Sequence, residues 1–301
     1  MSVKGLIFID ANQYLDLYAM PSWKTLLPGL QEQQDHILVT MQVVDEVNRN
    51  KVSVTAGFLA SKVNESKPHS AAAPNLSPKI IDAVVVRMRE RLQNIREKLS
   101  HDLLEQVSQS KDEVSKGLAG VFSQAVAHTD GELQRARVRK ERGNPPGKSG
   151  DPLGDQLNWE QILSHCKDKP PLWIMTRDSD YGTLHAGKMF LNAAFYQDLT
   201  RLYESEPTVF CFRKAAEGLE HFVNSTGAKA ERLPTPEEIE QINKEQESLP
   251  PNDWLRDYDD SAQIVLRLED TFRMRDATRW MTEFLSQVNS EVGIPPPQTK
   301  G

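Results

Sequence analysis

Four short apolar runs constrain the fold of this chain more than any other feature of its sequence. They are Gly5–Asp10, His36–Thr40, Leu172–Thr176 and Thr208–Phe212. Each run is too short for a helix and rich in β-branched or aromatic residues, which is typical of a buried strand. Stretches with the apolar spacing of helices lie between them. Strands that alternate with helices predict an α/β fold, with a parallel central sheet covered by helices on both faces.

The long middle region and the C-terminal tail do not follow this alternation. Apolar residues from Pro78 to about Ala127 recur every three or four positions, which predicts two helices broken near Gly117. With 301 residues, the chain is long enough for about two domains. We therefore expect one domain over residues 1–222, with a helical insertion at about 77–130. Residues 223–301 are expected to form an acidic linker and a C-terminal helical extension.

Composition excludes several classes of protein. Hydrophobic residues make up 38% of the chain, which is enough for a packed core. The two cysteines, Cys166 and Cys211, cannot build a disulfide framework or a cysteine-based zinc site. No apolar run approaches the ~20 residues of a membrane span, and the N-terminal apolar run is too short for a signal peptide. We expect a cytoplasmic protein without membrane association.

The charge of the chain is unevenly distributed. The net charge of -7 argues weakly against a nucleic-acid partner, but Arg135–Lys148 carries six basic residues and one acidic residue. Such a local excess of positive charge can bind phosphate whatever the total charge is. We expect Arg142 and Lys148 in this segment to contact the backbone of a nucleic acid.

Acidic residues stand where the predicted strands end. Asp10 ends the first run, and Asp178 and Asp180 follow the third. Glu46 lies one turn into the helix after the second run, and Asp155 opens the helix that follows a Gly/Pro loop. In open parallel sheets the functional crevice lies outside the carboxyl ends of the strands, so these acids are candidates for one site. Each acid taken alone is also compatible with a helix cap.

Electrostatic repulsion within a cluster of such carboxylates indicates a bound metal ion. Several carboxylates in one crevice repel one another by several kcal/mol unless cations neutralise them. Oxygen ligands without histidines suit Mg²⁺ or Mn²⁺ better than zinc. Paired ions of this kind serve in-line phosphoryl displacement, because one activates water and the other stabilises the leaving oxygen.

The order of these motifs resembles that of PIN-domain nucleases. The motifs are Ile7-Phe-Ile-Asp-Ala-Asn-Gln-Tyr14, Leu38-Val-Thr-Met-Gln-Val-Val-Asp-Glu46, Gly154-Asp-Gln-Leu-Asn-Trp-Glu160 and Ile174-Met-Thr-Arg-Asp-Ser-Asp180. The chain looks most like a large bacterial subgroup in which a Gly-x-Pro-Pro loop precedes a Gly-Asp-x-x-x-Trp-Glu helix. The resemblance covers roughly residues 3–222. It implies a three-layer α/β/α PIN-like domain and a metal-dependent ribonuclease.

The resemblance also implies roles for individual residues. It places the catalytic and metal-binding acids on Asp10, Glu46, Asp155 and Asp178, with Asp180 as an auxiliary ligand. Asn12 matches the polar residue after the first acid, and the residues expected to bind substrate are Asn12, Arg142, Lys148 and Arg177. The expected activity is Mg²⁺- or Mn²⁺-dependent endonuclease hydrolysis of RNA. A toxin or a defence nuclease with an antitoxin-like or other protein partner is compatible with it.

Three other functions remain open on the sequence. One is a nucleic-acid-binding or interaction module that keeps the fold without catalysis, although an intact set of acids argues against a site that only binds phosphates. Another is a structure-specific deoxyribonuclease of the flap-endonuclease type, for which the chain shows no obvious helical arch with an adjacent helix-hairpin-helix. The last is a metal-dependent phosphomonoesterase.

Overall fold

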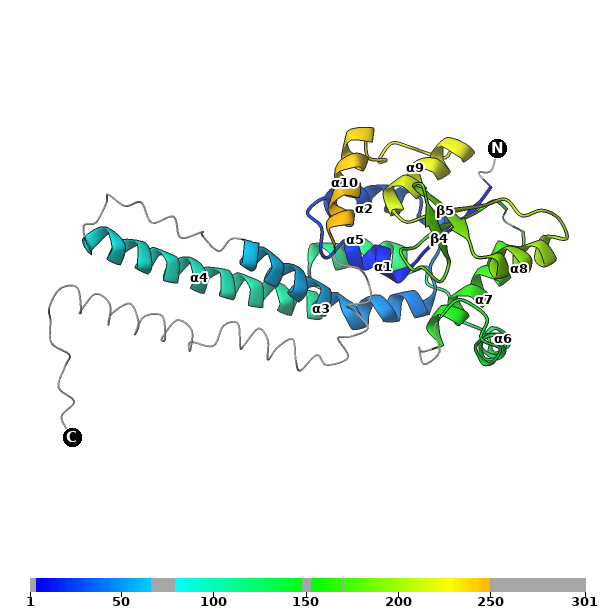
Figure 1. The fold of residues 1–301 in the computed structure, drawn as a ribbon, viewed down its shortest axis with the longest axis horizontal. Helices are drawn as coiled ribbons and strands as arrows, with labels where there is room; N and C mark the ends of the chain where they lie inside the picture. Colours follow the sequence, from blue (N-terminus) through cyan, green and yellow to red (C-terminus); the bar gives the residue numbers. More distant parts are fainter. Residues whose placement is uncertain (1–3, 66–78, 148–152, 169, 250–301) are drawn as a thin grey trace. The chain divides into compact units, whose positions relative to one another are not determined.

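The computed structural model describes residues 4–65, 79–147, 153–168 and 170–249. At its centre is a parallel sheet with the strand order β2-β1-β3-β6 (Figure 1). The strands are Leu6–Ile9 (β1), Ile37–Leu38 (β2), Leu172–Met175 (β3) and Val209–Phe212 (β6). All four predicted strands are present, each shorter than its apolar run. Phe8 of β1 lies between Leu38 and Ile174 in the register of the sheet.

Helices cover both faces of this sheet. On one face α9 (Ala215–Thr226) packs on β3 and β6, with α2 (Trp23–Glu32) and α10 (Pro236–Ser248) beside it. On the other face lie α7 (Gly154–Cys166) and α8 (Ala193–Tyr203), next to α6 (Asp130–Glu141) (Figure 1). The short α1 (Ala11–Asp16) follows β1, and the 3-10 turn Gln34–His36 leads from α2 into β2. The three-layer α/β/α architecture is therefore confirmed.

The inserted helices differ in length from the prediction. The helix after the second strand is α3 (Met41–Glu65), which packs along α4 (Lys79–Ser108). The break before α5 (Glu113–Phe122) lies at residues 109–112, so the prediction of a break near Gly117 was wrong. Gly117 lies inside α5, where an added Cβ would come within 2.2 Å of the Leu27 side chain on α2. The glycine allows close helix packing and does not end a helix.

An antiparallel hairpin after β3 was not predicted. It pairs β4 (Gly182–His185) with β5 (Lys188–Leu191) through a turn at Ala186 and Gly187. Both turn residues have positive φ, 47° and 78°, as a two-residue type I′ hairpin requires. The next helix, α8, therefore begins only at Ala193, after its Asn192 cap.

The residues after the predicted boundary at 222 continue to pack on the same body. Ile239 and Ile242 of α10 are buried, and the Gln246 side chain donates hydrogen bonds to Gln13 and Asp16 of α1. One compact unit spans Met1–Leu255. The predicted C-terminal extension after residue 249 lies outside the described residues. Within the described ranges, no helix combines the length and apolar composition needed to cross a membrane.

Candidate active site

Asp10 is fixed in place where β1 ends and α1 begins. It caps α1 by accepting a hydrogen bond from the Ala11 backbone at 2.8 Å through Oδ1. Its Oδ2 accepts from the Thr176 hydroxyl at 2.6 Å and from the Asn12 side-chain amide at 2.5 Å. The residue is 7% exposed. Because Thr176 directly follows β3, these bonds tie the ends of two neighbouring strands together at one carboxyl group.

The turn after β3 orders the next two acids. The Asp178 backbone donates to the Thr176 hydroxyl at 2.9 Å, and the Asp178 carboxylate accepts from the Asp180 backbone at 3.0 Å. The Asp180 carboxylate accepts from the Gly147 backbone at 3.1 Å. This last bond holds the Gly/Pro loop beside the turn, so Asp180 anchors the loop at the rim of the site.

Asp155 lies in the first turn of α7 and Glu46 in the second turn of α3, and these two helices touch. The Thr40 hydroxyl caps α3 by accepting from the Val43 backbone, and it donates to the Asn158 side chain of α7 at 2.6 Å. At the start of α7, an added Cβ on Gly154 would lie 2.3 Å from the Gln42 side chain of α3. The lack of a side chain at Gly154 thus allows this approach, which brings the two acid-bearing helix ends together.

The charges of the four candidate acids act on two buried groups, Asp10 and Tyr181. Burial, followed by the charges of Glu46 and Asp178, raises the pKa of Asp10 to about 7, although the Thr176 hydrogen bond opposes this shift. Burial also raises the pKa of Tyr181 well above its usual value, with further contributions from all four candidate acids, Asp10, Asp155, Asp178 and Glu46. All four acids, predicted from separate motifs, therefore influence Tyr181, and Glu46 and Asp178 also influence Asp10.

Tyr181 belongs to a cluster of buried aromatic rings. The Tyr181 ring packs against Phe8, Trp159 and Phe195, with centroid distances of 6.3, 6.4 and 5.3 Å. Trp159 is fully buried. The Tyr181 hydroxyl is buried without a hydrogen-bond partner in the described part of the chain. Tyr181 thus belongs to a buried apolar cluster, where the charges of the acids act on it through a low dielectric.

The chemistry of these side chains fits a hard divalent cation, since all four donors are carboxylates. Their arrangement is less complete than that of an assembled metal centre. Among the described residues, no three acidic, histidine or cysteine side chains stand around a common point in a way that could hold a metal ion. The four acids are therefore neighbours in the structure, and their joint binding of a metal stays a prediction.

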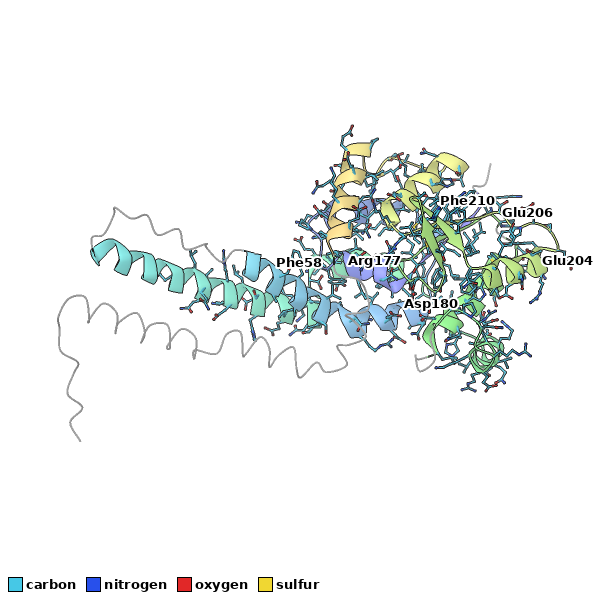
Figure 2. All side chains as sticks on the ribbon, in the orientation of Figure 1. Phe58, Arg177, Asp180, Glu204, Glu206 and Phe210 are labelled. Atoms are coloured by element: carbon cyan, nitrogen blue, oxygen red, sulfur yellow. The ribbon has the colours of Figure 1, made fainter. Side chains whose placement is uncertain are left out.

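Two of the residues expected to bind substrate are turned inward. The Asn12 amide donates to Asp10, and its carbonyl oxygen accepts from the Arg177 backbone at 3.2 Å. Arg177, labelled in Figure 2, pairs through its guanidinium with Asp16 of α1 at 2.9 Å, and only 13% of its side chain is exposed. Both residues stabilise the carboxyl end of the sheet in this structure. Arg142 is exposed at the end of α6, and Lys148 lies outside the described residues.

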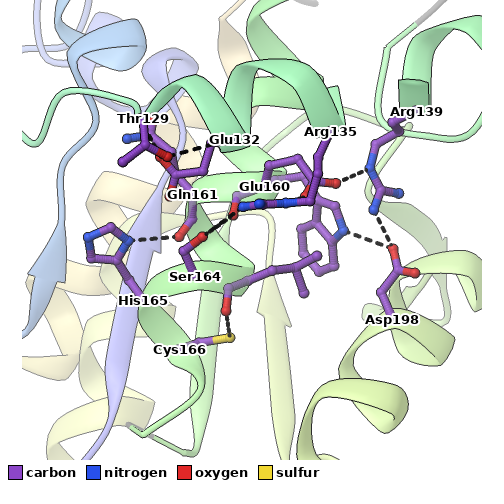
Figure 3. Close-up of polar contacts among 12 residues, drawn as sticks. Thr129, Glu132, Arg135, Arg139, Glu160, Gln161, Ser164, His165, Cys166 and Asp198 are labelled. Carbon is purple, nitrogen blue, oxygen red and sulfur yellow. Dashed lines mark hydrogen bonds and ion pairs between the residues drawn. The ribbon is translucent and has the colours of Figure 1, made fainter. Parts of the chain in front are cut away.

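Part of the basic segment is engaged in ion pairs (Figure 3). Arg139 is almost buried and pairs with Glu160 at 2.8 Å and with Asp198 at 2.7 Å. Arg135 also pairs with Glu160, at 2.9 Å, and the Trp159 indole donates to Asp198. The Trp-Glu end of the third motif therefore joins α6, α7 and α8. Arg137 of α6 and Arg142 at its end are exposed to solvent.

Sequence reasoning missed Thr176 and Tyr181. The Thr176 hydroxyl donates to the carboxylate of Asp10, and the charges of all four acids raise the pKa of Tyr181. Their positions carried a signal, because both belong to the segment that follows β3. Neither side chain is acidic, however, so neither was a candidate metal ligand.

Comparisons of the chain with protein-family models, with curated proteins and with solved structures found no match. The resemblance to PIN-domain nucleases consequently rests on the motifs themselves, and the family assignment stays a prediction.

Proposed function

We propose that this protein is a metal-dependent endonuclease that hydrolyses phosphodiester bonds of RNA at the carboxyl edge of its sheet. The observation that carries the proposal is the Asp10 carboxylate, which is buried and hydrogen-bonded where β1 and β3 end; its pKa is raised by burial and by the charges of Glu46 and Asp178. Burial of repelling carboxylates is costly and needs a compensating role. A cation in this neighbourhood would remove the repulsion. Asp10, Glu46, Asp155 and Asp178 are the residues that would hold it.

The side chains around this edge have distinct roles in the proposal. A bound Mg²⁺ or Mn²⁺ supplies charge neutralisation and activation of water. Thr176 and Asn12 orient the Asp10 carboxylate through their hydrogen bonds. Asp180 holds the Gly/Pro loop, which leads toward Lys148 in the sequence. Exposed Arg142 is available for the phosphate backbone.

The β4–β5 hairpin favours a single-stranded nucleic acid as the substrate. It begins directly after Tyr181, and Phe190 on its outer face is 50% exposed. The Lys188 ammonium lies 5.3 Å from the centroid of the Phe190 ring. An exposed aromatic ring beside a cation suits the stacking of an unpaired base next to its phosphate.

A nucleic-acid-binding module without catalysis is the second candidate. It is favoured by one observation, which is that no three acids of the described residues already stand in the geometry of a metal site. A protein of this kind would bind RNA without cleaving it, with or without divalent cations.

A cleavage assay separates these functions. Single-stranded RNA, single-stranded DNA, flap-structured DNA and a small phosphate monoester are incubated with the full chain in Mg²⁺, Mn²⁺ or a chelator. The proposal predicts metal-dependent internal cleavage of RNA, reduced by orders of magnitude in Asp178→Asn. Asp112→Asn changes a helix-capping aspartate outside the candidate site and should leave cleavage unchanged. RNA binding without cleavage in either metal would contradict the proposal and support the binding module.

A further inference from the structure

The helix α4 exposes a row of large apolar side chains. Leu92, Ile95 and Leu99 are 56%, 54% and 63% exposed, and every residue from 91 to 99 is exposed to solvent. Their spacing of three and four residues places them on one side of the helix. Single exposed leucines need no explanation, but a contiguous row marks an interaction surface.

The row follows the pattern of a coiled-coil seam. In the sequence, Ile81, Val85 and Met88 precede Leu92 with the same alternation of four and three residues. Together with Ile95 and Leu99 they occupy successive a and d positions over nearly three heptads. Because only a and d are apolar over residues 87–99, the seam is narrow and suits another helix. A helix that lies on a membrane presents a wider apolar face.

The seam is bordered by basic residues on both sides. Arg89, Arg91, Arg96 and Lys98 take the e and g positions of this heptad assignment. Glu90 and Glu97 take the f positions, on the opposite side of the helix. Over residues 89–98 of α4 the charges are therefore segregated, with positive charge along the seam and negative charge behind it.

This charge pattern argues against pairing between two copies of α4. In a parallel pair, Arg91 at g of one copy would face Arg96 at e of the other. In an antiparallel pair, e would face e and g would face g, which again brings only positive charges together. Either arrangement would be disfavoured by repulsion between like charges.

We propose that the surface of α4 formed by Leu92, Ile95 and Leu99 docks an acidic amphipathic helix of a partner protein. The partner would present apolar residues at its own a and d positions and Asp or Glu at e and g. Its acids would meet the basic border of the seam, and its apolar face would cover the exposed row. This inference does not depend on the proposed nuclease activity.

Two synthetic helical peptides test the proposal on the full-length chain. Both carry Leu and Ile at a and d, but one has Glu at e and g and the other has Lys. The acidic peptide should bind at least about tenfold more tightly at low salt, and the preference should shrink at high salt. In the charge-reversal variant Arg91→Glu/Arg96→Glu/Lys98→Glu, the preference should reverse. In Ile95→Asp/Leu99→Asp, binding of the acidic peptide should be lost.

The outcomes separate the possible occupants of this surface. The substituted side chains are solvent-exposed, so melting curves of both variants should match the wild type and exclude a folding defect. Equal affinity for both peptides, or no binding of the acidic one, overturns the proposal. So does self-association in sedimentation that Ile95→Asp/Leu99→Asp abolishes, because it identifies a second copy as the occupant. Tighter binding to anionic vesicles or to RNA than to the acidic peptide also overturns it.

Discussion

Replacing Asp10 with asparagine should stabilise the metal-free protein near pH 8. Asp10 is buried, and the nearby charges of Glu46 and Asp178 add to the cost of its ionisation. Asn has nearly the same shape and no charge, so the substitution removes this cost. A helix-capping aspartate outside such a cluster would behave differently, since its charge favours the helix N-terminus.

The size of the effect follows from the shift of the Asp10 pKa from its ordinary 3.8 to about 7. Because the folded pKa lies above the unfolded one, protonated Asp10 contributes stability below about pH 4 that is lost as the pH rises through 7. At pH 8 the full shift corresponds to on the order of 4 kcal/mol. An asparagine loses at least one accepted hydrogen bond, about 1–2 kcal/mol. The net gain of about 2–3 kcal/mol should raise the melting temperature by roughly 4–10 °C.

Asp112→Asn is the matched control for this measurement. Asp112 is also a buried N-cap, and it accepts from the Ser115 backbone at 2.8 Å. The charged neighbour of Asp112 is Lys51 and not a carboxylate, and the negative charge of Asp112 favours the protonated form of Lys51. Asp112→Asn should therefore leave stability unchanged or lower it by about 1–2 kcal/mol.

Thermal melts by circular dichroism, at pH 4 to 8 with chelator present, read out both variants. The advantage of Asp10→Asn should be absent near pH 4 and grow toward pH 8. The reasoning fails if Asp10→Asn melts below the wild type at pH 8, or if its shift is the same at both ends of the range.

Two further substitutions test the surroundings of the site. Arg139→Met should destabilise the protein by about 3–5 kcal/mol in chemical denaturation, because it leaves the buried carboxylate of Glu160 without its closest cation. Arg137→Met, on the exposed side of the same helix, should change stability by less than about 0.5 kcal/mol, and equal losses would contradict the structural role of Arg139. Phe190→Ala should weaken binding of single-stranded RNA by about 1–3 kcal/mol in fluorescence anisotropy, since a stacked base would lose its platform. Leu184→Ala, on the other face of the hairpin, should have little effect, and equal effects would argue against stacking on Phe190.

The sequence predicted the sheet well because a buried parallel strand has a strong local signature. The run Leu172–Thr176 is apolar on both faces, since helices cover both sides of β3. The position of the acids followed from the same logic, as all carboxyl ends of parallel strands share one edge. Asp10 and Asp178 are therefore held by the same Thr176 hydroxyl, although they lie far apart in the chain.

Other features depend on contacts that no local pattern records. Gly117 has the composition of a break, but its role is set by the approach of Leu27 from another helix. The inward orientation of Arg177 depends on the buried carboxylate of Asp16, whose own pKa is raised to about 6 by burial, with Arg177 opposing the shift. The hairpin was missed because its two strands are short and only partly buried, so the apolar Phe190 could be assigned equally well to the following helix.

Anomalous diffraction from crystals of the full chain soaked in Mn²⁺ tests the central claim most directly. The claim is that the four carboxylates at the edge of the sheet act together as a site for a divalent cation. It predicts an anomalous peak about 2.0–2.2 Å from carboxylate oxygens of Asp10 and Asp178, with Glu46 or Asp155 in the same coordination shell. The peak should disappear in Asp178→Asn. Well-ordered density for all four acids without an anomalous peak among them, at millimolar Mn²⁺ and pH 8, would contradict the claim.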